Sequence, residues 1–526
     1  MRFLALLLAL ALLLGGCSFL DSNLGWNEPV PYSEMQYTRP DPEALEQELA
    51  NICALLETDT DAAELMKAVY GFYDLYDSYL TDWYLADLHY CADLTDNYWE
   101  TEYNFCTENV PRLDAALEQL YMALTACPLR AQLEADYFGE GFFTAYEGEA
   151  TLDETYLALL EEEARLENEY YALSDEAMSM GVGSDAYYEA CSEPMAQLLA
   201  ELVAVRQKMA AYLGYESYTE LAYYGTFYRS YSPEEALSYL FSLKEALLED
   251  YIRLNGSDLW DFAGKYCDSQ ETFAYLKEAA TNMGGTVKYA FDLLESAGLY
   301  DIRYGENKYD SSFALYLWRY EEPFIFMNPY LDQTDKLTLV HEFGHFANDY
   351  ACYGSYAGTD VAEVHSQAME YLSLCYTRNT QELARYKFAD SLCTFLECAA
   401  YAVFEHRLYD LSPEELTPEN IAALYQKTGT EFGFESWDWD SRDFVTVVHF
   451  YTEPMYMISY VVSNDVALQF YQKERQKIGS GLTLYEEVLQ SQDSDIIAFA
   501  ETYGLESPFA EGRPEALAKT FAEILK

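Results

Sequence analysis

Basic residues are scarce in this chain of 526 residues: 30 Lys and Arg stand against 91 Asp and Glu, which gives a net charge of -61. Binding to nucleic acid or to an anionic membrane surface requires clustered cations. A chain with so few cations excludes both as general functions. The acidity favours solubility as its main consequence, and it would also attract cationic ligands.

Cysteine pairs and long apolar runs are missing as well. None of the 11 cysteines forms a C-x-x-C pair or clusters with histidine, which excludes the usual cysteine-based zinc sites. Most cysteines, such as Cys375, Cys393 and Cys398, lie in apolar helical runs and are predicted to be buried thiols. Beyond the first residues, no stretch is long and apolar enough to cross a membrane.

The first residues form a targeting signal. A basic start, an apolar run over residues 3–14 and the sequence L-G-G-C at 14–17 resemble a bacterial lipoprotein signal. They predict a signal peptide over 1–16 and a lipid on Cys17, with an ordinary secretory signal as the alternative. Residues 17–40 contain three prolines and are predicted to be a tether. We therefore expect an exported protein that only its lipid holds on the outer face of the cytoplasmic membrane.

The rest of the chain reads as helix after helix, so the predicted fold class is mostly α. Apolar residues recur at spacings of three and four, and S-P-E-E at 232–235 and again at 412–415 is typical of a helix N-terminus. One strand is predicted over 323–328, and its entry through a proline is typical of an edge strand. The predicted lobes are an N-terminal helical lobe, 41–200, and a larger one, 201–526. The clearest helices cover 43–56, 62–76, 112–127 and 152–173.

Histidine is also rare, yet two of the six histidines stand four positions apart in the motif H-E-x-x-H at residues 341–345. On a helix, His341 and His345 share one face and can bind the same metal ion. Glu342 stands beside them, where it can take a proton from a metal-bound water. This motif is the strongest chemical signal in the sequence.

The flanks of the motif predict that it lies on a buried helix. Apolar residues continue on both sides at helical spacing, and Asp332, Thr334 and Asp335 offer oxygens that can cap the first turn. Gly344 interrupts this pattern. A glycine inside a helix costs roughly 1 kcal/mol against alanine, so it usually has a reason. Here we expect it to let the backbone pass close to another element.

A catalytic zinc requires a third protein ligand. The extended motif H-E-x-x-H-x-x-G-x-x-H is excluded, because the chain has Asn348 and Ala351 where that motif has Gly and His. A carboxylate from a second helix is the remaining solution, and the candidates are Asp349, Asp360, Glu363 and Glu370. Glu363 and Glu370 are seven residues apart and share a helix face. We favour Glu363 as the ligand and Glu370 as the group that braces a ligand imidazole, although Glu370 also fits a solvated surface acid.

These residues resemble a known family. H-E-x-x-H followed by E-x-x-S-Q-x-x-E at 363–370 resembles the thimet oligopeptidase and oligoendopeptidase F family of zinc peptidases. The resemblance continues in order over about residues 200 to 470, through the segments 213–218, 231–235, 323–328 and 449–456. It implies a bowl-shaped, two-lobed helical fold with a small β element beside the motif helix and a deep cleft for short peptides.

The resemblance also implies roles for single residues. His341, His345 and Glu363 match the ligands of one zinc ion per chain, and Glu342 matches the general base. Three residues, His449, Tyr451 and Tyr456, fall on the segment that supplies hydrogen-bond donors to the tetrahedral intermediate. The implied substrate strand is Pro323, Phe324, Ile325, Phe326, Met327 and Asn328. The chain departs from the family at Ser311 and Ser312, where a Gly-Ala pair is common, and at Ile458, where a tyrosine is common.

The sequence therefore predicts a zinc-dependent endopeptidase that hydrolyses short peptides, with Glu342 as general base, and we expect it to be a monomer. Two alternatives stay open. An exopeptidase of the G-x-M-E-N type would need a glutamate that is absent between Met327 and Asn328. A catalytically inactive peptide-binding lipoprotein on the same fold would not need Glu342. Zinc is inferred from the ligand types, and manganese or cobalt are further options.

Overall fold

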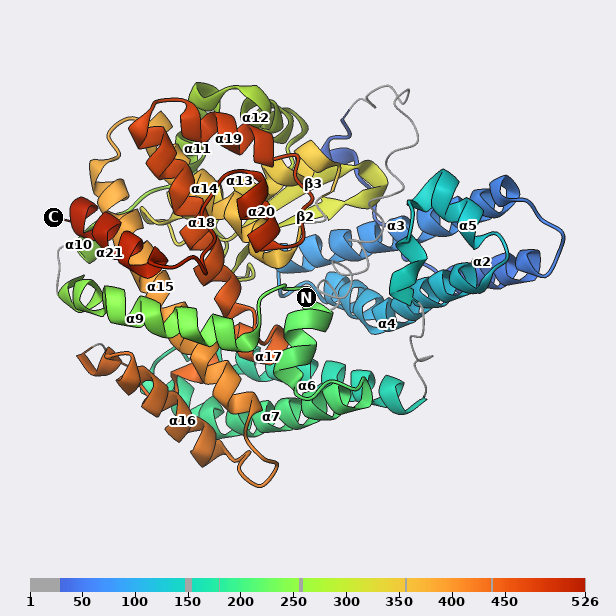
Figure 1. Cartoon of the computed structure of the whole chain (residues 1–526), viewed down its shortest axis with the longest axis horizontal. Coiled ribbons are helices and arrows are strands. Elements are labelled where there is room, and N and C mark those ends of the chain that lie inside the picture. The colour runs from blue at the N-terminus through green and yellow to red at the C-terminus, as the bar shows by residue number, and fades with distance from the viewer. Residues whose placement is uncertain are drawn as a thin grey trace.

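The computed structural model describes residues 29–146, 154–178, 180–254, 259–354, 357–436 and 439–525. The predicted signal peptide (1–16), Cys17 and the tether up to residue 28 lie outside these residues. The described chain is mostly helical with one small sheet, as the sequence predicted (Figure 1). None of its helices combines the length and the apolar character that crossing a membrane requires.

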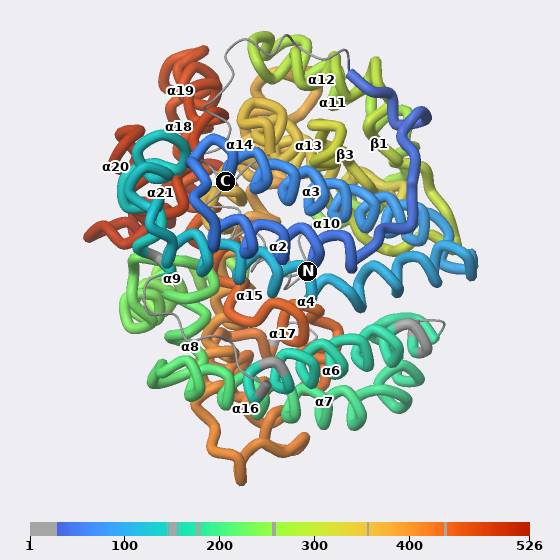
Figure 2. The backbone as a smooth tube through the Cα atoms, turned by 90° about the vertical axis from the view of Figure 1, so that its right-hand side faces the viewer, coloured from blue at the N-terminus to red at the C-terminus, as the bar shows by residue number. Residues whose placement is uncertain are grey.

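The helices form groups that Figures 1 and 2 show from two sides. The N-terminal group extends to the right in Figure 1 and contains α2 (Pro42–Leu56), α3 (Ala62–Ala92), α4 (Asn97–Ala126) and α5 (Arg130–Leu133). A second group at the bottom contains α6 (Glu154–Met178), α7 (Asp185–Tyr212) and α16 (Pro418–Glu431). Residues 200 and 201 lie inside α7, so the lobe boundary predicted there falls within a helix and not at a junction.

The remaining helices build the larger part of the molecule around the sheet. One set, on the left and in the middle of Figure 1, contains α8 (Tyr218–Glu220), α9 (Pro233–Leu254), α10 (Leu259–Ala263), α15 (Gln381–Tyr409) and α21 (Arg513–Ile524). The set near the sheet contains α11 (Ser269–Met283), α12 (Gly285–Ala297), α13 (Asp335–Cys352), α14 (Thr359–Tyr376), α18 (Met457–Gln476), α19 (Ser480–Val488) and α20 (Ile496–Thr502). The short helix α17 (Val448–Thr452) lies beside α6 and α7.

Aspartates begin several of the N-terminal helices. The side chain of Asp41 accepts a hydrogen bond from the backbone N–H of Glu43, that of Asp61 from Glu64, and that of Asp96 from Tyr98 and Trp99. A carboxylate at this position satisfies free amide groups and interacts favourably with the helix dipole. Part of the acidity of the chain therefore serves local structure.

One acid of this group is buried between α3 and α4. The Tyr76 hydroxyl donates to Asp114 Oδ1 at 3.3 Å, whereas Oδ2 has no partner in the described part of the chain. Burial raises the pKa of Asp114 to about 8, although the bond from Tyr76 opposes the shift. The folded chain thus holds a proton that the unfolded chain releases near pH 4, so stability falls as pH rises between these values.

We expect Asp114→Asn to stabilise the fold, because the amide keeps an acceptor for Tyr76 and has no charge to bury. The gain should be on the order of 1–3 kcal/mol near neutral pH. It should grow from pH 5.5 to pH 8.5, which thermal unfolding of both proteins across this range would measure. A gain that is constant or that shrinks with pH would mean that Asp114 is already ionised in the folded chain.

The sheet consists of β1 (Tyr300–Asp301), β2 (Ser312–Leu317) and β3 (Glu322–Met327) in the order β1-β3-β2. β3 pairs in parallel with β1 and antiparallel with β2 along its whole length. The prediction that residues 323–328 form an edge strand is therefore wrong: this strand is central, and β2 is the edge strand that follows it in the sheet.

The proline that suggested an edge costs the sheet no hydrogen bond. The backbone N–H of Ile325 donates to the carbonyl of Leu299, on the β1 side. Alternate residues of a strand face the same neighbour, so the nitrogen of Pro323 also faces that side. The pairing of β1 starts only opposite Ile325, so β1 has no carbonyl opposite Pro323 that would need an N–H donor.

The last part of the predicted tether is bound to the fold. The Tyr32 ring packs on Phe324 of β3, with ring centroids 4.4 Å apart. The backbone N–H of Thr38 donates to Asp82 on α3 at 3.0 Å, and Arg39 forms an ion pair with Glu102 on α4 at 2.7 Å. Residues 32–39 therefore connect the sheet to the N-terminal helices, and a free tether would have to end before them.

Candidate metal centre

The motif lies on the buried helix α13, as its flanks predicted. The cap differs from the expectation, because Thr334 makes no capping bond and Asp335 points back to the preceding loop. Its carboxylate accepts from the backbone N–H groups of Tyr330, Leu331 and Asp332 at 2.8–3.2 Å. This fixes the entry of the chain into α13 and with it the position of His341 and His345.

Gly344 lets α13 and α14 approach each other closely, as predicted. A Cβ atom built on Gly344 would lie 2.5 Å from Cα of Ser366 and 2.7 Å from the carbonyl oxygen of His365. Both atoms belong to the backbone of α14, which cannot give way like a side chain. The contact sets the distance between the two histidines on α13 and Glu363 on α14.

The structure brings His341, His345 and Glu363 together. One possible ligand atom from each lies within 4.8 Å of the others. Glu363 Oε2 is 3.4 Å from His341 Nε2 and 4.0 Å from His345 Nε2. Tetrahedral zinc with ligands at 2.0–2.2 Å holds them roughly 3.3–3.6 Å apart. The distance from Glu363 to His341 lies in this range and the distance to His345 is somewhat longer, so a small movement of His345 would complete the zinc geometry. The imidazoles are 21% and 24% exposed and leave a face open.

The electrostatics of these groups also favour a cation. Burial alone would lower the pKa of His341, but hydrogen bonds and charges from Glu363 and Glu370 raise it well above its usual value. Burial alone would raise the pKa of Glu363, but its bond to His341 and the nearby histidine charges lower it to about 2. Burial lowers the pKa of His345 to about 4. Two carboxylates thus act on one imidazole beside a second, neutral one.

Glu370 contacts the imidazole of His341 from behind. Its Oε1 lies 2.9 Å from His341 Nδ1, which leaves Nε2 free for a metal. Its Oε2 forms an ion pair of 2.7 Å with Lys387 on α15. Both partners are buried, so the charge of Glu370 is compensated inside the protein. Nothing in the sequence of α15 marks Lys387 as a residue that reaches α14.

Glu342 lies next to this cluster and faces the edge strand. Its side chain is 6% exposed. Burial raises the pKa of Glu342 to about 7, while the charge of His341 and a hydrogen bond with Ser312 of β2 lower it. The edge strand β2 therefore begins beside the carboxylate. The serine at 312, noted as a departure from the family, makes a contact that an alanine would lack.

His449 and Tyr456 lie on the other side of Glu363. The Tyr456 hydroxyl donates to Glu363 Oε1 at 2.6 Å, and its ring lies 5.0 Å from that of His449. Tyr460 joins them, with its ring 5.1 Å from Tyr456 and 5.9 Å from His449. Tyr460 was not predicted as a site residue, although it stands four residues after Tyr456 and on a helix must share its face.

Tyr451 does not belong to this group, and its predicted position is corrected. Its ring is fully buried and stacks on Tyr170 of α6 at 4.0 Å, and its hydroxyl has no partner among the described residues. On the short helix α17, residues 449 and 451 point about 200° apart. His449 therefore faces the cluster while Tyr451 packs against α6.

Arg206 on α7, which was not predicted either, holds α17 in place. Its guanidinium is fully buried and donates to the carbonyl oxygens of Phe450, at 3.3 Å, and Tyr451. Ion pairs with Glu163 at 2.7 Å and Glu167 at 2.9 Å compensate its charge. A buried charge is tolerated only with such partners, so this network joins α6 and α7 to the segment that carries His449.

Comparisons with known proteins agree with this architecture. Residues 32–152 match the family model of the peptidase M3 N-terminal domain. No curated protein matches the sequence. Among solved structures, an oligoendopeptidase F is similar with a TM-score of 0.81 and 20% identity, covering 94% of this chain and 98% of that one.

Two further structures have the same fold. PZ peptidase A with an inhibitor has a TM-score of 0.81 at 20% identity and covers 94% of this chain and 98% of its own. An oligoendopeptidase F from Bacillus anthracis str. Ames has a TM-score of 0.79 at 20% identity and covers 95% and 98%. These structures confirm the helical fold that the resemblance implies, and residues 32–152 match the peptidase M3 N-terminal domain.

Proposed function

We propose that this chain is a zinc-dependent endopeptidase that hydrolyses short peptides. The observation that carries the proposal is the meeting of His341, His345 and Glu363 in a geometry that suits tetrahedral zinc, with Glu342 between them and the edge strand β2. The match to the peptidase M3 N-terminal domain and the fold of the oligoendopeptidase F structures support the peptide as substrate.

A zinc ion held by these side chains would polarise the scissile carbonyl and acidify a water molecule. Glu342 takes a proton from the attacking water and returns one to the leaving amine. Its raised pKa, about 7, suits both directions of transfer. His449 and Tyr460, whose rings flank that of Tyr456, would stabilise negative charge on the carbonyl oxygen. The Tyr456 hydroxyl donates to Glu363 and so orients this carboxylate.

The corrected sheet changes which strand binds the substrate. β3 has neighbours on both sides, so an added peptide strand would pair with β2, the edge strand whose first residue, Ser312, contacts Glu342. Main-chain hydrogen bonds of this kind give affinity with little dependence on side chains. We further propose that the protein is exported, anchored through a lipid on Cys17, and active as a monomer.

The direct test is to incubate the purified protein with a defined mixture of short peptides and to identify the products by mass spectrometry, with and without a chelator. We expect internal cleavage that the chelator abolishes and that added zinc restores. Removal of single terminal residues would indicate the exopeptidase alternative. Zinc binding without any product would indicate a peptide-binding protein.

The charge compensation behind His341 predicts a change in zinc affinity. In Lys387→Met, the carboxylate of Glu370 loses its ion pair with the buried ammonium group. Its contact with His341 Nδ1, which orients the imidazole for the metal, is then less firmly held. Changes to groups that brace metal ligands typically cost 10- to 100-fold in affinity. We expect zinc to bind about tenfold more weakly, as measured by competition with a chromophoric chelator. The exposed Lys67→Met serves as control, and equal affinity in both variants would contradict the role of Lys387.

A further inference from the structure

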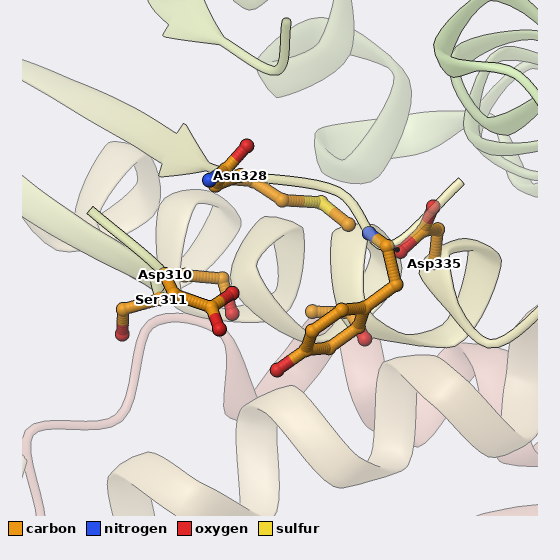
Figure 3. Close-up of a pocket in the computed structure, with 8 residues that line it drawn as sticks. Asp310, Ser311, Asn328 and Asp335 are labelled. Carbon is orange, nitrogen blue, oxygen red and sulfur yellow. Dashed lines mark hydrogen bonds between the residues drawn. The ribbon is translucent and has the colours of Figure 1, made fainter. Parts of the chain in front are cut away.

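A cavity of about 210 Å³ opens beside the metal centre, between the start of β2 and the start of α13. Figure 3 shows Asp310 and Ser311 on one side of it and Asn328 and Asp335 on the other. It is larger than a single water molecule needs. Ser312 lines the cavity and also contacts Glu342, so the cavity lies within one side chain of the proposed general base.

Most polar groups around the cavity are already engaged. The carboxylate of Asp335 accepts from three backbone N–H groups of the loop before α13. The Asn328 side chain is bonded to the backbone of Gly305 and Lys308 at 3.1 Å. These groups shape the wall of the cavity, and their polar atoms are already hydrogen-bonded to the protein backbone.

Asp310 differs from them. It is exposed, and its carboxylate has no hydrogen bond or ion pair within the described residues. Tyr330 also lines the cavity, although much of its side chain is exposed. Desolvation raises the pKa of its phenol and the charge of Asp310 raises it further, which places the two side chains near each other. No Lys or Arg is among the residues that line the cavity in the described part of the chain.

We propose that this cavity binds a cationic side chain, Lys or Arg, of the peptide substrate close to the bond that is cut, with Asp310 as its counter-charge. This inference rests on the proposed function and adds a preference to it. The free carboxylate supplies the charge, and the hydroxyls of Ser311 and Tyr330 are further acceptors at the wall. The net charge of -61 would attract the same peptides.

The test uses pairs of peptides that differ in one residue, Arg against the neutral isostere citrulline, placed in turn at each position around the cut. For the wild type we expect kcat/KM to be about tenfold higher for Arg at one position, from the Coulomb attraction in a partly solvated site. In Asp310→Asn the ratio of the two constants should fall to about one. The preference should also weaken as salt is added.

Several controls separate the sources of such an effect. Glu306→Gln removes an exposed acid from the neighbouring loop without touching the cavity, so it should keep the wild-type ratio. Acetylation of the peptide N-terminus should keep the preference, because a side chain and not the α-ammonium group is recognised. A wild-type ratio near one, or an unchanged ratio in Asp310→Asn, overturns the proposal.

The outcome is separable from the proposed function. If no peptide is cut, the endopeptidase proposal fails. The preference is then measured as binding of fluorescently labelled Arg and citrulline peptides to Glu342→Gln, with and without the Asp310→Asn substitution. If neutral peptides are cut and cationic ones are not favoured, only the inference about the cavity fails.

Discussion

Glu342→Gln should lower kcat/KM for peptide hydrolysis by about a thousandfold or more while zinc remains bound. Proton transfer by a positioned carboxylate contributes roughly 10²–10⁴-fold, and the attack and the departure of the amine both depend on it here. Glutamine has the same shape and can keep a contact with Ser312, but it accepts no proton. The measurements are steady-state hydrolysis of one peptide and the zinc content of the same sample.

The fold should tolerate this change. Burial raises the pKa of Glu342 to about 7, so removing its charge relieves a desolvation cost, and the unfolding temperature should stay equal or rise. Glu501→Gln, an exposed position on α20, is the matched control and should keep full activity. Turnover close to wild type in a zinc-loaded Glu342→Gln sample would remove Glu342 from the mechanism and with it the proposed function.

Local geometry made much of the site predictable. The two histidines of the motif share a face because any α-helix repeats every 3.6 residues, and the seven-residue spacing of Glu363 and Glu370 follows the same rule. The purpose of Gly344 was also accessible, since a glycine in a buried helix has few explanations. These inferences need only the chain's own periodicity, and the structure brings His341, His345 and Glu363 together with Glu370 behind His341.

The predictions that failed, or were not made, depend on partners far away in the sequence. A strand's place in the sheet depends on which segments pair with it. The proline of β3 therefore wrongly indicated an edge strand. The S-P-E-E at 412–415 shows the same limit. Glu415 does bond back to Ser412, yet the helix begins only at Pro418, because a proline there forces Thr417 into an extended conformation.

Lys387 and Arg206 show a further reason. Both are buried cations that form ion pairs with acids on other helices, and no spacing along α15 or α7 indicates these pairs. Tyr451 and Tyr460 are different, because the sequence carried the needed signal. On a helix, residues two apart point to opposite faces and residues four apart share a face. Tyr451 therefore cannot share the face of His449, whereas Tyr460 shares the face of Tyr456, so helical spacing alone would have predicted Tyr460 in place of Tyr451.

The contact at Gly344 predicts the largest combined loss of stability and metal binding. In Gly344→Ala the new methyl group would lie 2.5 Å from the Ser366 Cα and 2.7 Å from the His365 carbonyl oxygen, so α13 and α14 must separate. Overpacking of this kind typically costs 1–3 kcal/mol. Because Glu363 lies one turn before Ser366, its distance from the two histidines grows as well. We expect a lower unfolding temperature and at least about tenfold weaker zinc binding.

Gly71 of α3 is the matched control, because a Cβ there would meet only the flexible Glu48 side chain, at 3.7 Å. Alanine in that helix should stabilise the protein by roughly 0.5–1 kcal/mol, since it restricts the unfolded chain more than glycine does. The two substitutions are chemically identical, so opposite signs isolate the close approach of α13 and α14 as the cause. If Gly344→Ala bound zinc as tightly as the wild type, the helix contact would not set the metal geometry. The position of Glu363 would then have to come from the hydrogen bonds that it accepts from Ser366, at 3.1 Å, and from Tyr456, at 2.6 Å.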